Sequence, residues 1–382
     1  MSASLPLRIL FAGGGTGGHL YPAIAIANRI TEMLRGNGQI EIAFVGTKRG
    51  LEYRIKDELG YPLHLINMRG ITRSLAFINL LVPFIIVGAL WQSARLLKKF
   101  RPDLVVGTGG YVSWPILKMA ATLGIITVLQ EQNSYPGIAT RSGVKRAKRI
   151  YLGFEDAKKY LPDNANTILT GNPVRSEIVR GSRQKAIEQF KLDTNKKTIL
   201  VLGGSQGARA INNAVIKSLE AKNWGGDVQL LWQTGKRDYT DVSAQVNKLH
   251  WDGALFPFAN NMQDIYAAAD IVIARAGALT LAELIACRLP SILIPFPFAA
   301  GDHQKKNAES LSNRNAAVVI DESKLSGIDL LQEASQFLKS AKCLEVKNEI
   351  AKLAESKRAA VDVISEDIIS IINKTKQVGS GL

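Results

Sequence analysis

The sequence predicts an α/β protein with two Rossmann-like domains, each a doubly wound parallel sheet, facing one another across a cleft. Two observations predict this class. Glycine-rich segments at residues 13–18 and 203–207 each directly follow a short apolar run and precede a helical pattern. Such strand–turn–helix units hold phosphate groups at a helix N-terminus. Short apolar runs also alternate with helical patterns along both halves, as in parallel sheets covered by helices on both faces.

Composition sets the bounds on this interpretation. The chain has 382 residues, 46% of them hydrophobic, which suffices for two domains because single cores seldom grow beyond ~250–300 residues. The formal net charge of +15 predicts an anionic partner such as nucleic acid, an acidic membrane face or a phosphate-bearing substrate. Nucleic acid is not expected, because aromatic residues make up only 7% and no zinc spacing or RNA-binding signature occurs. Two cysteines outside any CxxC pattern, and no secretion signal at the N-terminus, predict a cytoplasmic protein.

The apolar runs place the strands and the domain limits. Strands are predicted in the first half at 8–12, 40–46, 63–66, 104–106, 125–129 and 149–152, and in the second at 198–202, 228–232, 254–256, 271–274, 291–294 and 317–320. A strand end and a turn at 169–175 predict the linker. We therefore expect an N-terminal domain over 1–172, a C-terminal domain over 173–342, and helices over 343–382 that pack back on the first domain.

One segment departs from the alternation. Residues 75–91 carry no charge and are flanked by Arg and Lys on both sides. Two interpretations stay open: a buried crossover helix of the sheet, or an apolar patch ringed by basic residues that dips into an anionic membrane surface. A membrane span is not expected, because Asn79, Pro83 and Gly88 interrupt a segment slightly short of ~20 residues.

The first glycine loop partly matches two known templates. It has the GxGxxG spacing of dinucleotide-binding proteins, but the following strand ends at Thr47 without the acid that holds a ribose diol. Lys48 and Arg49 could instead bind a 2′-phosphate, so binding of NADP stays open as an alternative. The P-loop template fails because His19 stands where a lysine must. A helix start disfavours the imidazolium, so His19 is predicted to stay neutral and act as a general base, the alternative being a capping or packing role.

Three further segments carry candidate chemistry. Residues 107–111 form another glycine loop after an apolar run, or else a tight turn. Glu283 falls in the first turns of a predicted helix, where it suits a ribose diol or merely favours the helix start. The polar cluster at 301–308 suits sugar hydroxyls or a solvated loop. Because the chain has no Asp-x-Asp, a metal bridge to a diphosphate is not indicated. We expect no metal site and no cofactor.

Taken together and in order, the segments 13–19, 107–111, 131–133, 171–175, 203–208, 277–283 and 301–308 closely resemble the MurG family. Its members are bacterial transferases that add N-acetylglucosamine to lipid I to make lipid II for peptidoglycan synthesis. The resemblance implies a GT-B glycosyltransferase, with UDP-N-acetylglucosamine bound mainly in the second domain and the undecaprenyl-diphosphate acceptor in the membrane-facing first domain. It also implies peripheral attachment to the cytoplasmic side of the bacterial plasma (inner) membrane.

The resemblance assigns roles to individual residues. Donor contacts are implied at Thr16, Gly17, Gly18, Asn133, Arg175, Ser205, Ala278, Leu279, Thr280, Leu281, Ala282, Glu283 and Gln304. Of these, Glu283 is expected on the ribose and Gln304 on sugar hydroxyls. The acceptor diphosphate is expected at the two glycine loops of the first domain, at Gly14, Gly15, Gly109, Gly110 and Tyr111.

The expected chemistry is inverting transfer. The C4 hydroxyl of the acceptor sugar attacks the anomeric carbon, with His19 as base, and UDP leaves. The helix start after residues 203–207, aided by Arg175 or Arg275, stabilises the leaving diphosphate. Three other functions stay open: a diacylglycerol galactosyltransferase of similar fold, an NADP-dependent oxidoreductase, and a non-catalytic sugar-nucleotide sensor.

Overall fold

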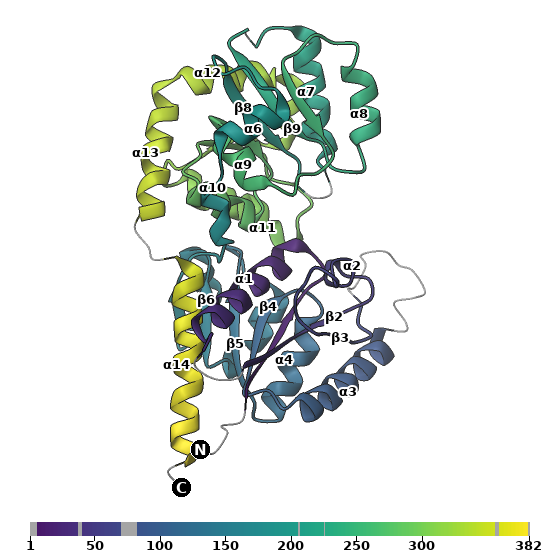
Figure 1. Cartoon of the computed structure of the whole chain (residues 1–382), viewed down its shortest axis with the longest axis vertical. Helices are drawn as coiled ribbons and strands as arrows, with labels where there is room; N and C mark the ends of the chain where they lie inside the picture. The colour runs from purple at the N-terminus through teal and green to yellow at the C-terminus, as the bar shows by residue number, and fades with distance from the viewer. Residues whose placement is uncertain are drawn as a thin grey trace. The chain divides into compact units, whose positions relative to one another are not determined.

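The computed structural model describes residues 6–36, 40–69, 82–204, 207–224, 226–355 and 359–380. The chain divides into two compact units (Figure 1). Unit 1 comprises Met1–Val174 and Arg358–Leu382, and unit 2 comprises Arg175–Lys357.

Unit 1 is a seven-stranded sheet in the order β3-β2-β1-β4-β5-β6-β7, and the strand pairs are parallel. The strands are β1 (Leu7–Gly13), β2 (Ile40–Gly46), β3 (Leu63–Leu65), β4 (Leu104–Gly109), β5 (Ile126–Glu131), β6 (Arg149–Leu152) and β7 (Thr167–Leu169). Each strand predicted in this half is present. The sequence showed only the end of β7, at residue 169.

Helices cover both faces of this sheet, as the doubly wound class requires. They are α1 (Gly17–Met33), α2 (Leu51–Arg54), α3 (Val82–Phe100), α4 (Ser113–Thr122), α5 (Ile138–Gly143) and α14 (Ala360–Ser380), with short 3-10 turns η2 (Val144–Arg146) and η3 (Glu155–Tyr160). One core joins the sheet to α1 and α14 through residues such as Ile26 and Ile368. The other joins it to α3 and α4 through Leu97 and Ile116.

Unit 2 is a six-stranded sheet in the order β10-β9-β8-β11-β12-β13, again with parallel pairs. Its strands are β8 (Lys197–Leu202), β9 (Val228–Gln233), β10 (Gly253–Phe256), β11 (Ile271–Ala274), β12 (Ser291–Leu293) and β13 (Val318–Val319). The α-helices are α6 (Arg183–Phe190), α7 (Arg209–Ala221), α8 (Tyr239–Val246), α9 (Met262–Ala268), α10 (Ala278–Ala286), α11 (His303–Ser312), α12 (Leu330–Lys339) and α13 (Ala341–Glu355). The 3-10 turns are η4 (Ser176–Val179), η5 (Ala300–Asp302) and η6 (Glu322–Gly327). Two parallel α/β units confirm the predicted fold class.

The segment 343–382, which we expected to pack on the first domain as a whole, is divided between the units. Helix α13 lies in unit 2, because Cys343 and Val346 are buried in that unit's core. Helix α14 lies beside α1 in unit 1 (Figure 1).

Charged pairs hold α14 on unit 1. The Arg29 Nε lies 2.6 Å from Asp362, and the Arg149 Nε lies 2.9 Å from Asp367. The hydroxyl of the fully buried Tyr151 donates to the same Asp367 at 2.9 Å. The last helix is therefore a part of the first unit, although the whole second unit separates them in sequence.

The sheet orders place one reversal of strand order in each unit. In unit 1 the chain moves outward from β1 to β2 and β3, then returns to β4 on the other side of β1. In unit 2 the same reversal lies between β8 and β11. Ligands of open α/β sheets bind at the carboxyl ends of the strands at such points, so these two positions are where a site is expected.

The uncharged segment 75–91 is described only from residue 82, where α3 begins, and 75–81 lie outside the described residues. Helix α3 buries Ala89, Ser93 and Leu97 on the side that packs against α4. Its opposite side exposes Phe84 by 76%, Val87 by 66% and Trp91 by 63%. One face of the helix is therefore buried, as a crossover helix of the sheet requires, and the other face exposes apolar side chains. In the part of the chain that is described, no helix combines the length and apolarity needed to cross a membrane.

Candidate active site

The first glycine loop joins β1 to α1 at the reversal of unit 1. Thr16 precedes the helix in an extended conformation, and the N–H groups of His19 and Leu20 both donate to its carbonyl oxygen at 3.2 Å. Gly15 has φ of +87°, a left-handed conformation that glycine adopts without strain. Thr16 and Gly18 are exposed and Gly17 is half-buried, so this loop presents its backbone at the edge of the sheet.

The loop after β4 packs directly against the first. Gly109 and Gly110 have φ of +98° and +83°. A Cβ on Gly109 would lie 2.7 Å from Nδ1 of His19, and one on Gly110 would collide with the carbonyl of Gly14. These glycines therefore let the two loops approach one another, and the predicted acceptor residues Gly14, Gly109 and Gly110 are brought together.

His19 lies between these loops, half-buried. Its Nδ1 is 3.1 Å from the carbonyl oxygen of Thr108 and 3.0 Å from Oε1 of Gln132. Both partners are oxygen acceptors, so Nδ1 carries a proton, and in the neutral ring the lone pair is then on Nε2. An imidazole in this form can accept a proton at Nε2.

A buried glutamate that the sequence analysis missed organises the same loop. Glu52 in α2 is fully buried, and its carboxylate accepts the N–H of Gly15 at 2.8 Å and that of Thr47 at 2.9 Å. Gly46 and Gly50 leave the room that this side chain fills. Since Glu52 takes the N–H of Gly15, a diphosphate at this loop must find its donors elsewhere. Only the position of Glu52 shortly after a predicted strand end could have indicated it.

Tyr111, the fifth expected acceptor residue, closes the cluster. Its hydroxyl lies 3.0 Å from the hydroxyl of Thr47, and its ring lies against Gly15, where a Cβ would be 2.9 Å from Cε1. The loops after β1, β2 and β4 thus meet at one edge of the sheet.

Asn133 is held by a second buried carboxylate. The Oε1 of Glu131 accepts its backbone N–H at 3.0 Å and its Nδ2 at 3.3 Å. The Oε2 accepts the N–H of Gly137 at 2.9 Å and the hydroxyl of Thr140 at 2.6 Å. Asn133 is therefore fixed by its own loop, next to Gln132.

In unit 2 the second glycine loop follows β8 and leads into α7. Gly204 and Gly207 have φ of +80° and +81°, and the N–H of Gly207 donates to the carbonyl of Gly204 at 3.1 Å. Gly207 lies against the carbonyl of Thr234, where no side chain fits. Ser205, an expected donor contact, lies outside the described residues.

The loop after β11, at the other side of the reversal, leads into α10. Gly277 precedes this helix in an extended conformation. Leu281 is fully buried and its N–H donates to the carbonyl of Gly277 at 3.0 Å. Ala278 is buried, whereas Leu279, Thr280 and Ala282 are half-buried. The start of α10 therefore offers backbone groups and Thr280 to a ligand, while Leu281 belongs to the core.

Glu283 lies in the second turn of α10 and interacts with two groups of unit 2. The hydroxyl of Tyr266 donates to its Oε2 at 2.8 Å. Burial raises the pKa of Glu283, while the hydrogen bond from Tyr266 and the positive charge of Arg175 act against that rise. Burial likewise raises the pKa of Cys287, one turn further on, to about 12. The expected donor residues Arg175 and Glu283 are thus neighbours.

Gln304 in α11 contacts the loop after β12. Its Oε1 accepts the backbone N–H of Phe296 at 3.0 Å, so a bond to a sugar hydroxyl depends on its amide nitrogen. The buried Asn307 donates to the carbonyl of Ala276 at 3.2 Å. Helix α11 is therefore tied to both loops that flank the expected sugar position.

Arg275 is engaged by protein groups on all sides. Its guanidinium pairs with Glu322 and donates to the carbonyls of Ile294 and Pro295 at 3.1 and 3.3 Å. It also lies 5.4 Å from the ring centre of Phe296, and its side chain is only 12% exposed. Of the two arginines expected to aid the leaving group, Arg275 is used to hold the loop after β12.

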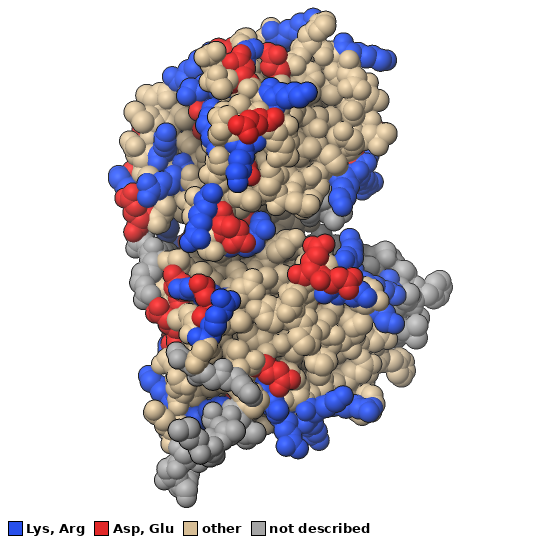
Figure 2. Space-filling view, viewed as in Figure 1, with Lys and Arg blue, Asp and Glu red and all other residues tan. Residues whose placement is uncertain are grey.

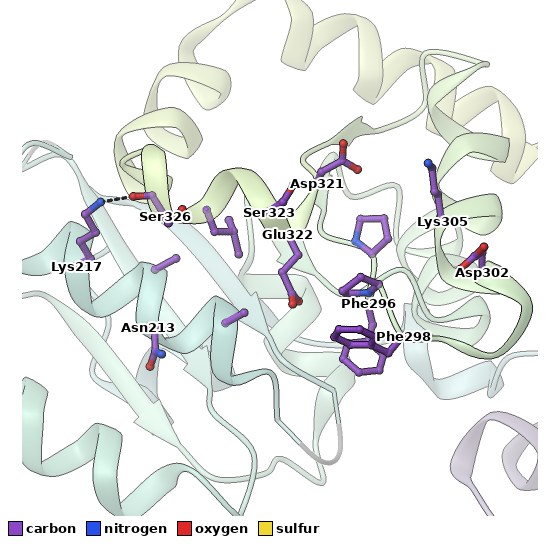
Figure 3. Close-up of a pocket in the computed structure, with 15 residues that line it drawn as sticks. Asn213, Lys217, Phe296, Phe298, Asp302, Lys305, Asp321, Glu322, Ser323 and Ser326 are labelled. Atoms are coloured by element: carbon purple, nitrogen blue, oxygen red, sulfur yellow. Dashed lines mark hydrogen bonds between the residues drawn. The ribbon is translucent and has the colours of Figure 1, made fainter. Parts of the chain in front are cut away.

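A pocket of about 800 Å³ opens in unit 2 between α7, the loop after β12, and η6 (Figure 3). Phe296 and Phe298 form one wall, with Asn213 and Lys217 of α7 opposite. The expected donor residues are not among those that line it. Among the described residues, no three His, Cys, Asp or Glu side chains are grouped as a metal site would need.

Comparison with known families shows where the chain belongs. The glycosyltransferase family 28 N-terminal domain matches residues 9–152, and the C-terminal domain of the same family matches residues 198–363.

Full-length relatives point to one group within that family. A protein of Desulforamulus reducens is 39% identical, covering 96% of this chain and 98% of its own. A protein of Flavobacterium psychrophilum is 39% identical, covering 97% of this chain and 99% of its own. A protein of Chlorobium limicola is 42% identical, covering 85% of this chain and 89% of its own. All three bear the name UDP-N-acetylglucosamine--N-acetylmuramyl-(pentapeptide) pyrophosphoryl-undecaprenol N-acetylglucosamine transferase.

Solved structures agree with this placement. The crystal structure of Acinetobacter baumannii MurG has 25% sequence identity and a TM-score of 0.73, covering 97% of this chain and all of that one. The calicheamicin glycosyltransferase CalG4, at 14% identity and a TM-score of 0.68 over 97% of this chain and 99% of its own, shares the fold. The expected GT-B architecture is confirmed, and the chain belongs to glycosyltransferase family 28, in its MurG group of N-acetylglucosaminyltransferases.

Proposed function

We propose that this protein transfers N-acetylglucosamine from UDP-N-acetylglucosamine to the C4 hydroxyl of the N-acetylmuramyl sugar of lipid I, with inversion, and so forms lipid II for peptidoglycan synthesis. The observation that carries the proposal is full-length similarity, at 39% identity over 96% of the chain, to a protein named for this transfer. The arrangement of His19 supports it, because a basic nitrogen lies at the point in unit 1 where an acceptor is expected.

The reaction needs one proton transfer and one leaving group. Nε2 of His19 takes the proton of the acceptor hydroxyl while its oxygen attacks the anomeric carbon. The bond from that carbon to the diphosphate oxygen breaks, and UDP leaves with the electron pair. His19 returns its proton to solvent afterwards. Such base catalysis contributes typically about 10²–10⁴ in rate.

The departing diphosphate needs positive charge in unit 2. The N–H groups at the start of α7 supply partial positive charge at a helix end. Arg175 adds a full positive charge beside Glu283, and we assign it to the leaving diphosphate on the ground of that charge. Glu283 then holds the ribose, Gln304 the sugar hydroxyls, and the start of α10 the remaining donor contacts. We further assign Thr16, Gly17, Gly18 and Asn133 to the donor from unit 1.

We assign the acceptor diphosphate to the clustered loops after β1 and β4. The backbone can approach the diphosphate closely at Gly14, Gly109 and Gly110, and Tyr111 offers its hydroxyl. Gly15 only leaves room for the diphosphate, because its N–H is bonded to Glu52.

The transfer itself is tested with radiolabelled UDP-N-acetylglucosamine and a short-chain lipid I analogue. We expect label in the lipid product. Binding of the donor without transfer would contradict the proposal and favour another acceptor, such as diacylglycerol, or a sensor. Transfer from UDP-galactose in preference would favour the galactosyltransferase, and a rise in melting temperature with NADPH would favour the oxidoreductase.

We infer that unit 1 also attaches the protein to an anionic bilayer, from the cytoplasmic side of the bacterial plasma membrane. Phe84, Val87 and Trp91 form an exposed stripe on one side of α3, and the same side continues into Arg95 and Lys98. Figure 2 shows Lys and Arg side chains gathered at the lower edge of unit 1, where α3 lies in Figure 1. An apolar stripe that ends in cations suits the boundary between acyl chains and anionic headgroups.

Replacing Trp91 with serine is expected to weaken binding to vesicles of phosphatidylcholine and phosphatidylglycerol by roughly tenfold or more, because burying such a side chain contributes about 1.5–3 kcal/mol. Cosedimentation measures the change. Leu344→Ser is the matched control, because Leu344 is 61% exposed on α13 of unit 2. Wild-type binding should also fall with added salt and without the anionic lipid. Binding that changes neither with added salt nor with the anionic lipid would contradict the electrostatic contribution to membrane attachment.

A further inference from the structure

Three buried carboxamides form a chain of hydrogen bonds that ends at His19. Gln130 is 1% exposed, Gln132 is 2% exposed and Asn172 is 8% exposed. The first two lie at the end of β5, and Asn172 lies beyond β7. A buried polar group costs free energy unless it is hydrogen-bonded. Each of these three amides is therefore expected to keep the orientation that satisfies its hydrogen bonds.

Backbone carbonyls set the direction of every bond in the chain. Nδ2 of Asn172 donates to the carbonyl of Gln132 at 2.8 Å, so Oδ1 of Asn172 is its acceptor. That oxygen accepts Nε2 of Gln130 at 2.9 Å, which leaves Oε1 of Gln130 as an acceptor. A carbonyl cannot donate, so each link fixes the orientation of the next amide.

The side-chain amide of Gln132 is oriented by the same kind of hydrogen bond. Its Nε2 donates to Oε1 of Gln130, to the Gln130 carbonyl at 3.0 Å and to the Thr108 carbonyl at 2.7 Å. Its Oε1 is thereby turned toward Nδ1 of His19, 3.0 Å away. Were the amide reversed, its nitrogen would face Nδ1 and favour the proton on Nε2, and that form cannot accept a proton at Nε2.

We propose that Gln132 is a positioning residue that selects the tautomer of His19, with Gln130 and Asn172 holding Gln132 in the orientation this needs. The expected effect on kcat rests on the proposed function. The tautomer of His19 does not, because it is a property of the protein alone. The carbonyl of Thr108 favours the same form, and Gln132 adds a second acceptor to it.

The ionisable side chains of the neighbouring elements bond to groups other than His19. The carboxylate of Glu52, from α2, is bonded to Gly15 and Thr47. That of Glu131, from β5, is bonded within its own loop. The hydroxyl of Tyr111, from the loop before α4, is bonded to Thr47. These bonds leave the selection of the tautomer to Thr108 and Gln132.

The test is the ¹⁵N spectrum of the full-length protein labelled in its histidine rings, in which protonated and unprotonated ring nitrogens have distinct shifts. The chain has four histidines, and the His19→Ala variant assigns the resonances of His19. We expect the wild type to carry its proton on Nδ1. A proton on Nε2 would overturn the inference without any variant being made.

Gln132→Met removes the second acceptor. We expect the Nε2-protonated form of His19 to appear and kcat to fall about 2- to 12-fold, the equivalent of one lost hydrogen bond, with KM for UDP-N-acetylglucosamine unchanged.

Gln229→Met is the matched control, because Gln229 is 2% exposed on β9 in unit 2 and holds Asp193 and Thr198. It reports the cost in melting temperature of losing a buried carboxamide, and should leave the His19 spectrum unchanged. An unchanged tautomer in folded Gln132→Met would overturn the inference while leaving His19 as the base. Full turnover in His19→Ala would instead contradict the base, whatever the spectra show.

Discussion

Replacing His19 with alanine is expected to lower kcat by about 10²- to 10⁴-fold, while the affinity for UDP-N-acetylglucosamine should stay within about twofold. The reason is geometric. Nδ1 is bonded to Thr108 and Gln132, so Nε2 is the nitrogen left with a lone pair for the acceptor hydroxyl, and alanine removes it. Steady-state transfer to a short-chain lipid I analogue measures kcat, and calorimetric titration measures donor binding.

Two further variants separate chemistry from structure. His19→Asn retains an N–H donor near the position of Nδ1 but has no basic nitrogen, so its loss should equal that of His19→Ala. His250→Ala is the matched control, because His250 is exposed in unit 2, and it should behave as the wild type. Near-full turnover in His19→Asn would mean that the side chain only supports the loop.

The second large effect is on donor binding. Glu283→Ala should raise the Kd for UDP-N-acetylglucosamine roughly 10- to 150-fold, the equivalent of about 1.5–3 kcal/mol for a hydrogen bond to a charged group. Within the described residues Tyr266 donates to Oε2, and the ribose diol is expected to add its donors to the same carboxylate. Titration calorimetry gives the Kd, and Glu220→Ala, an exposed acid on α7, is the matched control.

The same carboxylate predicts a dependence of binding on pH. Burial raises the pKa of Glu283, although the hydrogen bond from Tyr266 and the charge of Arg175 act against that rise. Only the ionised carboxylate accepts hydrogen bonds from both hydroxyls of the ribose diol. Donor affinity should therefore be complete above this raised pKa and be lost as the pH falls through it, earlier than an ordinary glutamate would titrate. Glu283→Gln should flatten the profile. A profile that is the same in wild type and Glu283→Gln would show that another group titrates.

Local pattern was enough for the strands and for the glycine loops. Strands such as β1 and β8 are continuous apolar runs because they are buried on both faces of a parallel sheet, and the glycines after them mark turns that other residues cannot make. Local pattern was not enough for the segment 343–382. Helices α13 and α14 have similar apolar spacing, and the core that each one joins depends on partners such as Val346 in unit 2 and Asp367 beside Tyr151 in unit 1.

The candidate site shows the same division. His19, Glu283 and Gln304 could be chosen from the sequence, because each stands beside a glycine loop or in a polar cluster after a strand. Arg275 looked equally available, yet Glu322 and the carbonyls after β12 engage it. Glu52 and Gln132 gave little signal, since a buried glutamate and a buried glutamine resemble surface residues in a sequence.

By itself, then, the sequence determined two parallel α/β units, because strand runs and glycine turns are local features with fixed spacing, and its motifs together showed a resemblance to a family of transferases. Only the tertiary structure decided which side chains surround His19, that Arg275 is engaged by Glu322 and by the carbonyls after β12, and where the last helix packs. These depend on groups far apart in the chain, such as His19 and Gln132, which meet because parallel strands bring their carboxyl ends to one edge of a sheet.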